Sequence, residues 1–190
     1  AKAQELLNGQ TTDQGKVEAL YQYVAKNFRY VSLSLGQGRY QPHAAAEVMA
    51  NQYGDCKDKH TLLAAMLQAA GIRAYPALMN SVRKIDPDVP SPGQFAHVIT
   101  AIPLGKEILW ADTTAEIAPF QLLSPVLRDK KALLVTDKTS ARLETTPADP
   151  PFQSKEVLDV DGQITDLGRF TGRTRLSLRG DSEMLFRMMF

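Results

Sequence analysis

The segment Tyr53-Gly54-Asp55-Cys56-Lys57-Asp58-Lys59-His60 decides how this chain is organised, because it places the single cysteine where a helix is expected to begin. The helix-forming run that follows ends at Gly71. A thiol at a helix N-terminus faces unpaired N–H groups and the positive end of the helix dipole, and both favour the thiolate. The segment therefore predicts a nucleophilic cysteine. A lone cysteine is more often a small buried hydrophobe, so its position alone leaves both interpretations open.

Length and composition restrict the class of protein. The chain has 190 residues, with 44% hydrophobic and 23% charged residues, which is typical of a globular protein. The net charge of +1 gives no reason to expect nucleic acid or a membrane surface as a partner. One cysteine cannot form an intrachain disulfide, and no Cys/His cluster has the spacing of a structural zinc site, so we expect no metal and no cofactor. No apolar run is long enough for a membrane span.

Hydrophobic periodicity predicts a mixed chain of helices and strands. An amphipathic pattern with a Thr12 or Asp13 N-cap favours a helix to residue 28, and the polar, proline-containing stretch 80–94 predicts a long loop. We expect the first-turn residues Lys57, Asp58 and Lys59 to lie in solvent. The expected helices cover residues 1–8, 12–28, 42–50 and 56–70, and the expected strands cover residues 30–35, 72–79, 95–102, 107–112 and 133–135.

The last quarter of the chain changes character. We expect a core domain over residues 1–146, followed by a linker and the start of a C-terminal β domain over residues 147–190. Residues 156–163 onward predict a β-hairpin that turns at Asp161-Gly162. The chain starts with Ala1 and ends in the apolar segment 183–190, so we expect flanking domains in a longer protein.

A cysteine nucleophile needs a base, and the base needs a group that orients it. His97 lies in the expected strand 95–102, and Asp112 ends the next one. If Leu104-Gly105 forms the hairpin tip, His97 and Asp112 lie directly opposite on one face. A one-residue slip would put them on opposite faces. The order Cys56, His97, Asp112 thus predicts a catalytic triad.

Other residues compete for these roles. His60 lies four residues after Cys56 on the same helix face and is the alternative base, although only Asp58 or a distant acid remains to orient it. We interpret His43 as a surface or packing histidine. Trp110 is in phase with Asp112, where it either walls the site or packs in the core.

The residues around Cys56 resemble the core motif of transglutaminase-like proteins. The resemblance covers Tyr53 to Lys59 and the run from Leu62 to Ala74, and it continues at His97 and at Trp110-Ala111-Asp112-Thr113-Thr114. The Gly-Asp-Cys-Lys-Asp version is similar to bacterial multi-domain members of the superfamily. The resemblance implies an α+β, papain-like fold, with the nucleophile helix packed on an antiparallel sheet. It also suggests a location in the bacterial cell envelope or periplasm.

The resemblance further implies roles for the triad: Cys56 as nucleophile, His97 as base and acid, and Asp112 as the orienting group. We expect acyl transfer on protein or peptide amides, with two alternatives: a cysteine peptidase or amidase that uses water, and a non-catalytic interaction domain. The Cys56 N–H is the expected oxyanion donor. The candidates for a second donor are Gln37, Tyr30 and Tyr40. No Asp-rich loop of the calcium type is present.

Overall fold

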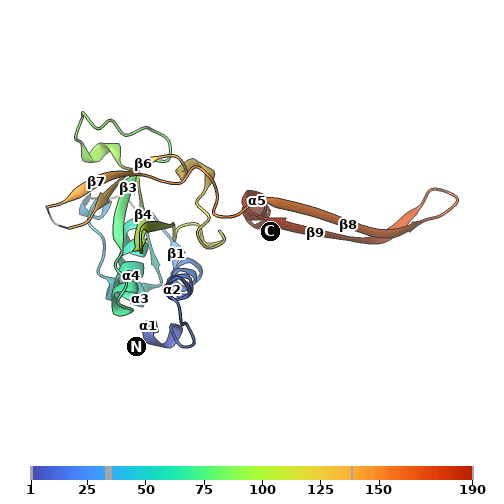
Figure 1. Ribbon diagram of the computed structural model, residues 1–190, viewed down its shortest axis with the longest axis horizontal. Helices are drawn as coiled ribbons and strands as arrows, with labels where there is room; N and C mark the ends of the chain where they lie inside the picture. Colours follow the sequence, from blue (N-terminus) through green and yellow to red (C-terminus); the bar gives the residue numbers. More distant parts are fainter. Residues whose placement is uncertain (1, 33–35, 138, 190) are drawn as a thin grey trace. The chain divides into compact units, whose positions relative to one another are not determined.

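The computed structural model describes the chain except for residues 1, 33–35, 138 and 190. It divides into two compact units, Ala1–Asp149 and Pro150–Phe190, each described here by itself (Figure 1). The predicted boundary at residue 146 lies close to this division, and the assignment of residues 147–190 to a further β domain stays a prediction.

The first unit combines helices with a curved antiparallel sheet. Its helices are α1 (Lys2–Leu6), α2 (Asp13–Asn27), α3 (Ala45–Asn51) and α4 (Cys56–Ala69), with 3-10 turns η1 (Gly36–Arg39), η2 (Pro92–Gln94) and η3 (Pro125–Leu127). Its strands are β1 (Arg29–Tyr30), β2 (Tyr53–Gly54), β3 (Tyr75–Met79), β4 (His97–Leu104), β5 (Glu107–Ala111), β6 (Lys131–Val135) and β7 (Ala141–Thr145). This arrangement confirms the predicted α+β class.

Five strands form one sheet in the order β5-β4-β3-β6-β7, and every neighbouring pair is antiparallel. The short strands β1 and β2 form a separate parallel pair, in which Tyr30 lies opposite Gly54. Strand β7 was not predicted. It has no buried face that would give an alternating apolar pattern, since four of its residues are exposed and Glu144 is half-buried. The predicted strand 30–35 is largely wrong: strand β1 ends at Tyr30, residues 31 and 32 lie in no strand, and residues 33–35 lie outside the described part of the chain.

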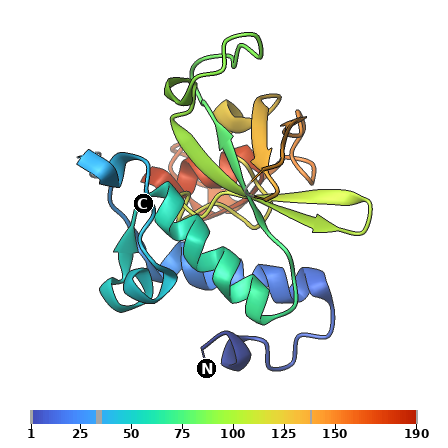
Figure 2. The same ribbon diagram turned by 90° about the vertical axis from the view of Figure 1, so that its left-hand side faces the viewer.

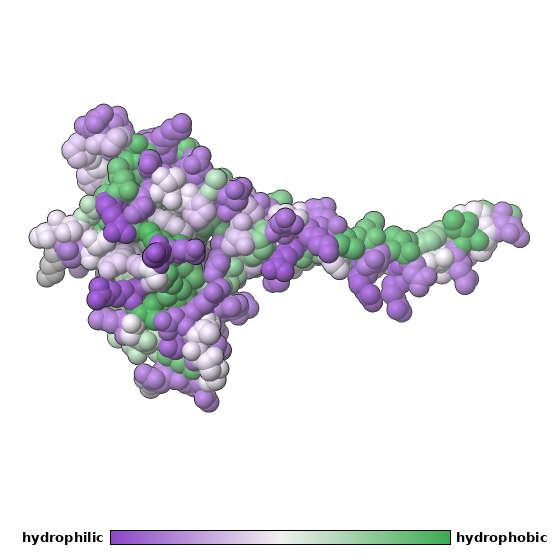
Figure 3. Space-filling model, in the orientation of Figure 1, coloured by the Kyte–Doolittle hydropathy of each residue, from purple (hydrophilic) through white to green (hydrophobic). Residues whose placement is uncertain are grey.

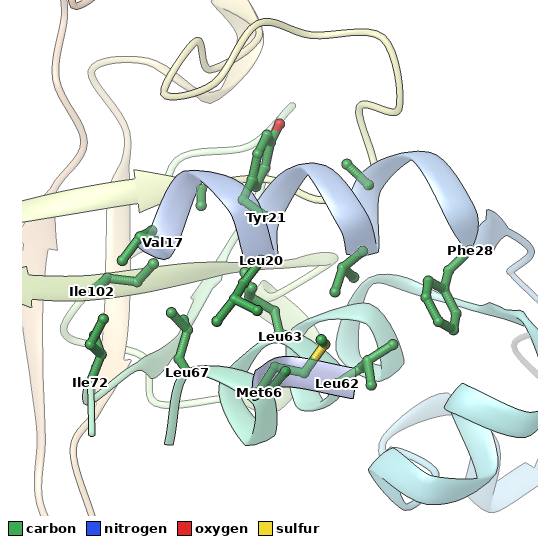
Figure 4. Packing of buried hydrophobic residues seen from close by; sticks show 14 of the residues in the cluster. Val17, Leu20, Tyr21, Phe28, Leu62, Leu63, Met66, Leu67, Ile72 and Ile102 are labelled. Atoms are coloured by element: carbon green, nitrogen blue, oxygen red, sulfur yellow. The ribbon is translucent and has the colours of Figure 1, made fainter. Parts of the chain in front are cut away.

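The main core lies between α2, α4 and one face of the sheet. Helices α2 and α4 lie side by side (Figure 2), and their apolar side chains meet Ile102 of β4 (Figure 4). The buried side chains of this cluster include Val17, Leu20, Tyr21, Val24 and Phe28 from α2 and its C-cap, and Leu62, Leu63, Met66 and Leu67 from α4. Burying one such side chain contributes about 1.5–3 kcal/mol. Helix α4, which begins at Cys56, is thereby held against the sheet, as predicted.

A second hydrophobic cluster lies on the opposite face of the sheet. Met79, Ile99 and Trp110 pack there against Leu123 and Leu127. Trp110 is therefore a core residue. Apolar side chains therefore pack against both faces of the sheet, from α2 and α4 on one face and from the segment of Leu123 and Leu127 on the other.

The β4–β5 hairpin turns one residue later than predicted. Leu104 pairs with Glu107, so the tip is Gly105-Lys106 rather than Leu104-Gly105. Gly105 has a φ of +65°, which suits the first central position of a type II′ turn. The parity of the ladder is unchanged, so His97 and Asp112 keep positions of the same face, but they are diagonal rather than directly opposite.

The second unit consists of the hairpin β8 (Lys155–Ile164) and β9 (Phe170–Arg179), followed by α5 (Asp181–Met189). The predicted turn at Asp161-Gly162 is wrong: Gly162 lies within β8 opposite Gly172, and the chain turns over residues 165–169. Glycine is needed there because a Cβ at residue 162 would lie 2.5 Å from the ring of Phe170.

One face of this hairpin is apolar and exposed. Leu158 pairs with Leu176, and Ile164 pairs with Phe170, and all four are exposed. Figure 3 shows apolar surface along this hairpin. Among the described residues, no helix has the length and hydrophobicity required to cross a membrane.

Candidate active site

Cys56 is the first residue of α4. The carboxylates of Asp55 before it and Asp58 after it cap the start of this helix. The Asp55 carboxylate caps the helix and accepts from the backbone N–H groups of Lys57 and Asp58. The Asp58 carboxylate reaches back to the Asp55 N–H at 3.2 Å, which completes a capping box. None of these three bonds uses the Cys56 N–H. The Cys56 side chain is half-buried.

The capping box is held by a further contact. His43 donates its backbone N–H to Asp58 at 2.8 Å, and its Nδ1 lies 3.0 Å from the other carboxylate oxygen. Burial acts to raise the pKa of Asp58, but the bonds from His43 and Asp55 outweigh it and hold this pKa below its usual value. The prediction that Lys57, Asp58 and Lys59 lie in solvent is wrong, since Asp58 and Lys59 are buried and Lys57 is half-buried and paired with Asp55. Helix periodicity alone does not reveal partners that come from other segments.

The structure brings His97 and Asp112 into contact. His97 opens β4, Asp112 follows the last residue of β5, and His97 Nε2 lies 3.1 Å from Asp112 Oδ2. Cys56 is also among the groups that raise the pKa of His97, through its charge and its hydrogen-bonding sulfur. The structure thus pairs His97 with Asp112, and the electrostatics of His97 involve Cys56 as well.

The electrostatics of this trio favour a protonated imidazole. Burial alone would lower the pKa of His97, but its hydrogen bonds to Asp112 and Cys56, together with their charges, raise it to about 10. Burial would also raise the pKa of Asp112, yet the bonds from His97 and Thr114 keep it below its usual value. The arrangement therefore suits an ionised carboxylate beside an imidazolium.

Two residues that sequence reasoning missed hold Asp112 in place. Thr114 donates both its N–H and its hydroxyl to Asp112 Oδ1, at 2.9 and 2.7 Å, which leaves Oδ2 for His97. Tyr21 from α2 donates its hydroxyl to the Asp112 backbone carbonyl at 3.1 Å. The only signal for Thr114 in the sequence was its place two residues after Asp112, a spacing at which a carboxylate commonly accepts from the backbone.

His60, the alternative base, lies inside the fold. It is 8% exposed, and its Nδ1 lies 2.9 Å from the Thr100 hydroxyl of β4. Burial lowers the pKa of His60 to about 4, so the ring is neutral at ordinary pH. The structure thus places His60 between α4 and the sheet.

The structure distinguishes between the three candidates for a second oxyanion donor. Tyr30 lies opposite Gly54 in the β1–β2 pair, and its phenol has a pKa raised by burial and by the charge of Cys56. Tyr40 is exposed and has the Arg39 guanidinium over its ring. The side chain of Gln37 lies outside the described part of the structure. Of the residues described, Tyr30 is the candidate that the backbone places near Cys56, because its ladder partner Gly54 lies two residues before Cys56.

The comparison with protein families now identifies the fold. The model of the transglutaminase-like superfamily matches residues 1–105, which include Cys56 and His97. The chain belongs to the transglutaminase-like superfamily. None of the curated proteins matches it.

Two solved structures are similar to this superfamily member. One is a candidate protease from Parabacteroides distasonis, with a TM-score of 0.61 and 17% identity over 78% of this chain and 27% of that chain. The other is a candidate cysteine protease from Cytophaga hutchinsonii, with a TM-score of 0.50 and 15% identity over 95% of this chain and 50% of that one. At these identities the likeness shows the fold. The chain spans about a quarter and half of the lengths of these two proteins.

Proposed function

We propose that this chain catalyses acyl transfer from protein or peptide amides through a thioester on Cys56. The observation that supports the proposal is the contact of His97 with the buried Asp112 carboxylate at 3.1 Å, with Cys56 among the groups that raise the pKa of His97. A nucleophile, a base in contact with it and a buried acid that orients the base are the groups that this chemistry needs.

In the proposed reaction, the Cys56 sulfur attacks the amide carbonyl carbon as the thiolate. His97 carries the proton and gives it to the departing nitrogen as the C–N bond breaks, which leaves a thioester and a free amine. An amine or water then attacks the thioester carbon, and His97 takes its proton while Cys56 leaves as the thiolate. Asp112 stays ionised throughout and orients the ring through Nε2, so that Nδ1 is left for the thiol.

The tetrahedral intermediates carry a negative oxygen that needs donors. We assign the Cys56 N–H as one donor, because the Asp55 carboxylate takes the N–H groups of Lys57 and Asp58 instead. The Tyr30 hydroxyl is the proposed second donor, since Tyr30 pairs with Gly54, two residues before Cys56, and the charge of Cys56 helps to raise the pKa of this phenol. Removing one such donor lowers kcat by about 10²–10³ in other enzymes.

Hydrolysis is the second candidate reaction, and one observation favours it. Both similar structures are described as candidate proteases, one of them as a cysteine protease. A peptidase or amidase would use the same three residues with water as the acceptor. The two reactions therefore differ only in what resolves the thioester.

The deciding experiment incubates the protein with a glutamine peptide and with peptides that contain ordinary amide bonds, each with and without a primary amine. Mass spectrometry identifies the product, and Cys56→Ala is the control. An amide with the added amine supports the transferase, whereas a free acid or a cleaved peptide in both conditions supports hydrolysis. Absence of every product, together with a Cys56 thiol no more reactive than free cysteine, contradicts catalysis and favours the interaction domain.

A further inference from the structure

Lys59 is a buried charge that the proposed reaction does not use. It lies on α4 three residues after Cys56, and its side chain is 0% exposed. Its ammonium group donates to the Phe28 carbonyl at 2.5 Å and to the Ala25 carbonyl at 3.3 Å, both at the C-terminal end of α2. These carbonyls lack partners within the helix, so Lys59 caps α2 from α4. A buried ammonium is retained only where such partners compensate for its lost hydration.

Glu116 connects this buried charge to a third segment. Its Oε1 lies 3.7 Å from the Lys59 Nζ and accepts the backbone N–H of Tyr30 at 2.8 Å. Glu116 lies four residues after Asp112, in the loop that follows β5. One carboxylate therefore joins the nucleophile helix, the loop beside Asp112 and strand β1.

Strand β1 carries Tyr30, the proposed second oxyanion donor. Tyr30 lies opposite Gly54, and the next residue, Val31, donates its N–H to the Gly54 carbonyl at 3.0 Å. Gly54 is two residues before Cys56, so the Tyr30 backbone is tied to the site on both sides: to β2 through the ladder and to Glu116 through its own N–H. Loss of the hydrogen bond to Glu116 would leave the Tyr30 backbone held only by its pairing with β2.

We propose that Lys59 and Glu116 are positioning residues that fix Tyr30 beside Cys56. Lys59 holds the Glu116 carboxylate by charge, and Glu116 holds the Tyr30 amide, which sets where the Tyr30 phenol lies. The kinetic consequence rests on the proposed function, whereas the ordering of Tyr30 does not.

The test uses Glu116 because its side chain is 42% exposed, and a substitution there leaves the core intact. Glu116→Ala removes both contacts, and Glu116→Gln keeps an acceptor for the Tyr30 N–H while it removes the charge. Glu107→Ala, an exposed glutamate beside the tip of the β4–β5 hairpin, is the matched control. Lys59→Met is the companion variant, and the Glu116 series carries the test if that protein does not fold.

Glu116→Ala is expected to speed hydrogen exchange of the Tyr30 amide by about tenfold and to lower kcat by about tenfold with little change in KM, because a bond to a charged acceptor is lost. Glu116→Gln is expected to restore part of both, because it keeps the acceptor for the Tyr30 N–H but loses the attraction of Lys59, and Glu107→Ala is expected to leave both unchanged. The melting temperature should be similar in all three variants.

Three results would overturn the inference. One is unchanged exchange at Tyr30 in Glu116→Ala, whatever happens to kcat. Another is a lower melting temperature with normal exchange and normal kcat, which would indicate a role in stability alone. The third is a Glu116→Gln variant that restores none of the rate and none of the protection. If the wild-type protein turns over no amide, the proposed function fails, and exchange at Tyr30 together with the alkylation rate of Cys56 still decides this inference.

Discussion

His97 Nε2 lies 3.1 Å from Asp112 Oδ2, although the β4–β5 ladder does not pair these two residues. The ladder pairs Thr100 with Ala111, and its extension would place His97 opposite Thr114 and diagonal to Asp112. Diagonal neighbours share a face, and a ring and a carboxylate are long enough to span the separation. The contact therefore depends on the parity of the ladder and on side-chain length, while the tip of the hairpin can shift by one residue without breaking it.

Asp112→Asn tests the orienting role of this carboxylate. An amide keeps the shape but offers the wrong partner to the imidazolium, so we expect kcat on the amide substrate to fall by up to about 10⁴, with little loss of stability. Steady-state kinetics with Thr114→Val as the companion variant checks this, since loss of one of the two Thr114 bonds should lower kcat far less. Near-normal kcat in Asp112→Asn would contradict the proposed role.

The identity of the base is tested by alkylation of Cys56 at low pH. A free cysteine is only about 1% thiolate at pH 6.5, so a thiol paired with imidazolium should react faster there. We expect His97→Ala to lower the rate of iodoacetamide alkylation at pH 6.5 by about tenfold or more. His60→Gln should leave it within about twofold, because His60 lies against Thr100. The reverse order of effects would show that the assigned base is wrong.

His60 should make the protein less stable as the pH falls. Burial lowers its pKa to about 4, whereas the unfolded chain has the ordinary value of about 6.5. Between these values the unfolded state binds the proton and the folded state does not, so stability is complete above pH 6.5 and is lost toward pH 4. The free energy of unfolding should fall by about 2–3 kcal/mol between pH 7 and pH 4.5 from this residue alone.

Denaturant unfolding at several pH values measures this effect, with His60→Gln as the variant that does not titrate. The raised pKa of His97 acts between pH 6.5 and about 10, outside this window. The lowered pKa values of Asp58 and Asp112 act below 3.8. An equal pH slope in wild-type and His60→Gln protein would contradict the assignment.

Gly54→Ala tests the close approach that precedes the nucleophile. A Cβ at residue 54 would lie 2.6 Å from the Cβ of Asp58, in the capping box of α4. We expect a loss of stability of about 1–3 kcal/mol, as for overpacking in a core. Gly38→Ala is the control, because no atom lies within 4 Å of its added Cβ. Thermal unfolding of both variants gives the comparison, and equal melting temperatures would rule out the clash.

Local patterns were sufficient for most helices and strands of the first unit. Thr12 caps α2 as its side-chain chemistry suggested, and Gly71, with a φ of +76°, follows the end of α4. The failed prediction of a turn at Asp161-Gly162 shows what local patterns lack. The Asp161-Gly162 pair has the composition of a turn, yet it lies within β8, because the partner strand extends the ladder past it to Phe170. A dipeptide carries no information on how long its partner strand is.

The sequence by itself determined the superfamily, the helix that begins at Cys56, and the parity that puts His97 and Asp112 on one face, because these depend on local spacing and on a short hairpin. Only the tertiary structure decided the surroundings of these residues. Segments distant in the sequence bury Asp58 and Lys59, give His60 its contact with Thr100, and bring Glu116 to the Tyr30 amide. The environment of a charged group depends on which segments pack around it, and no periodicity within one helix records that.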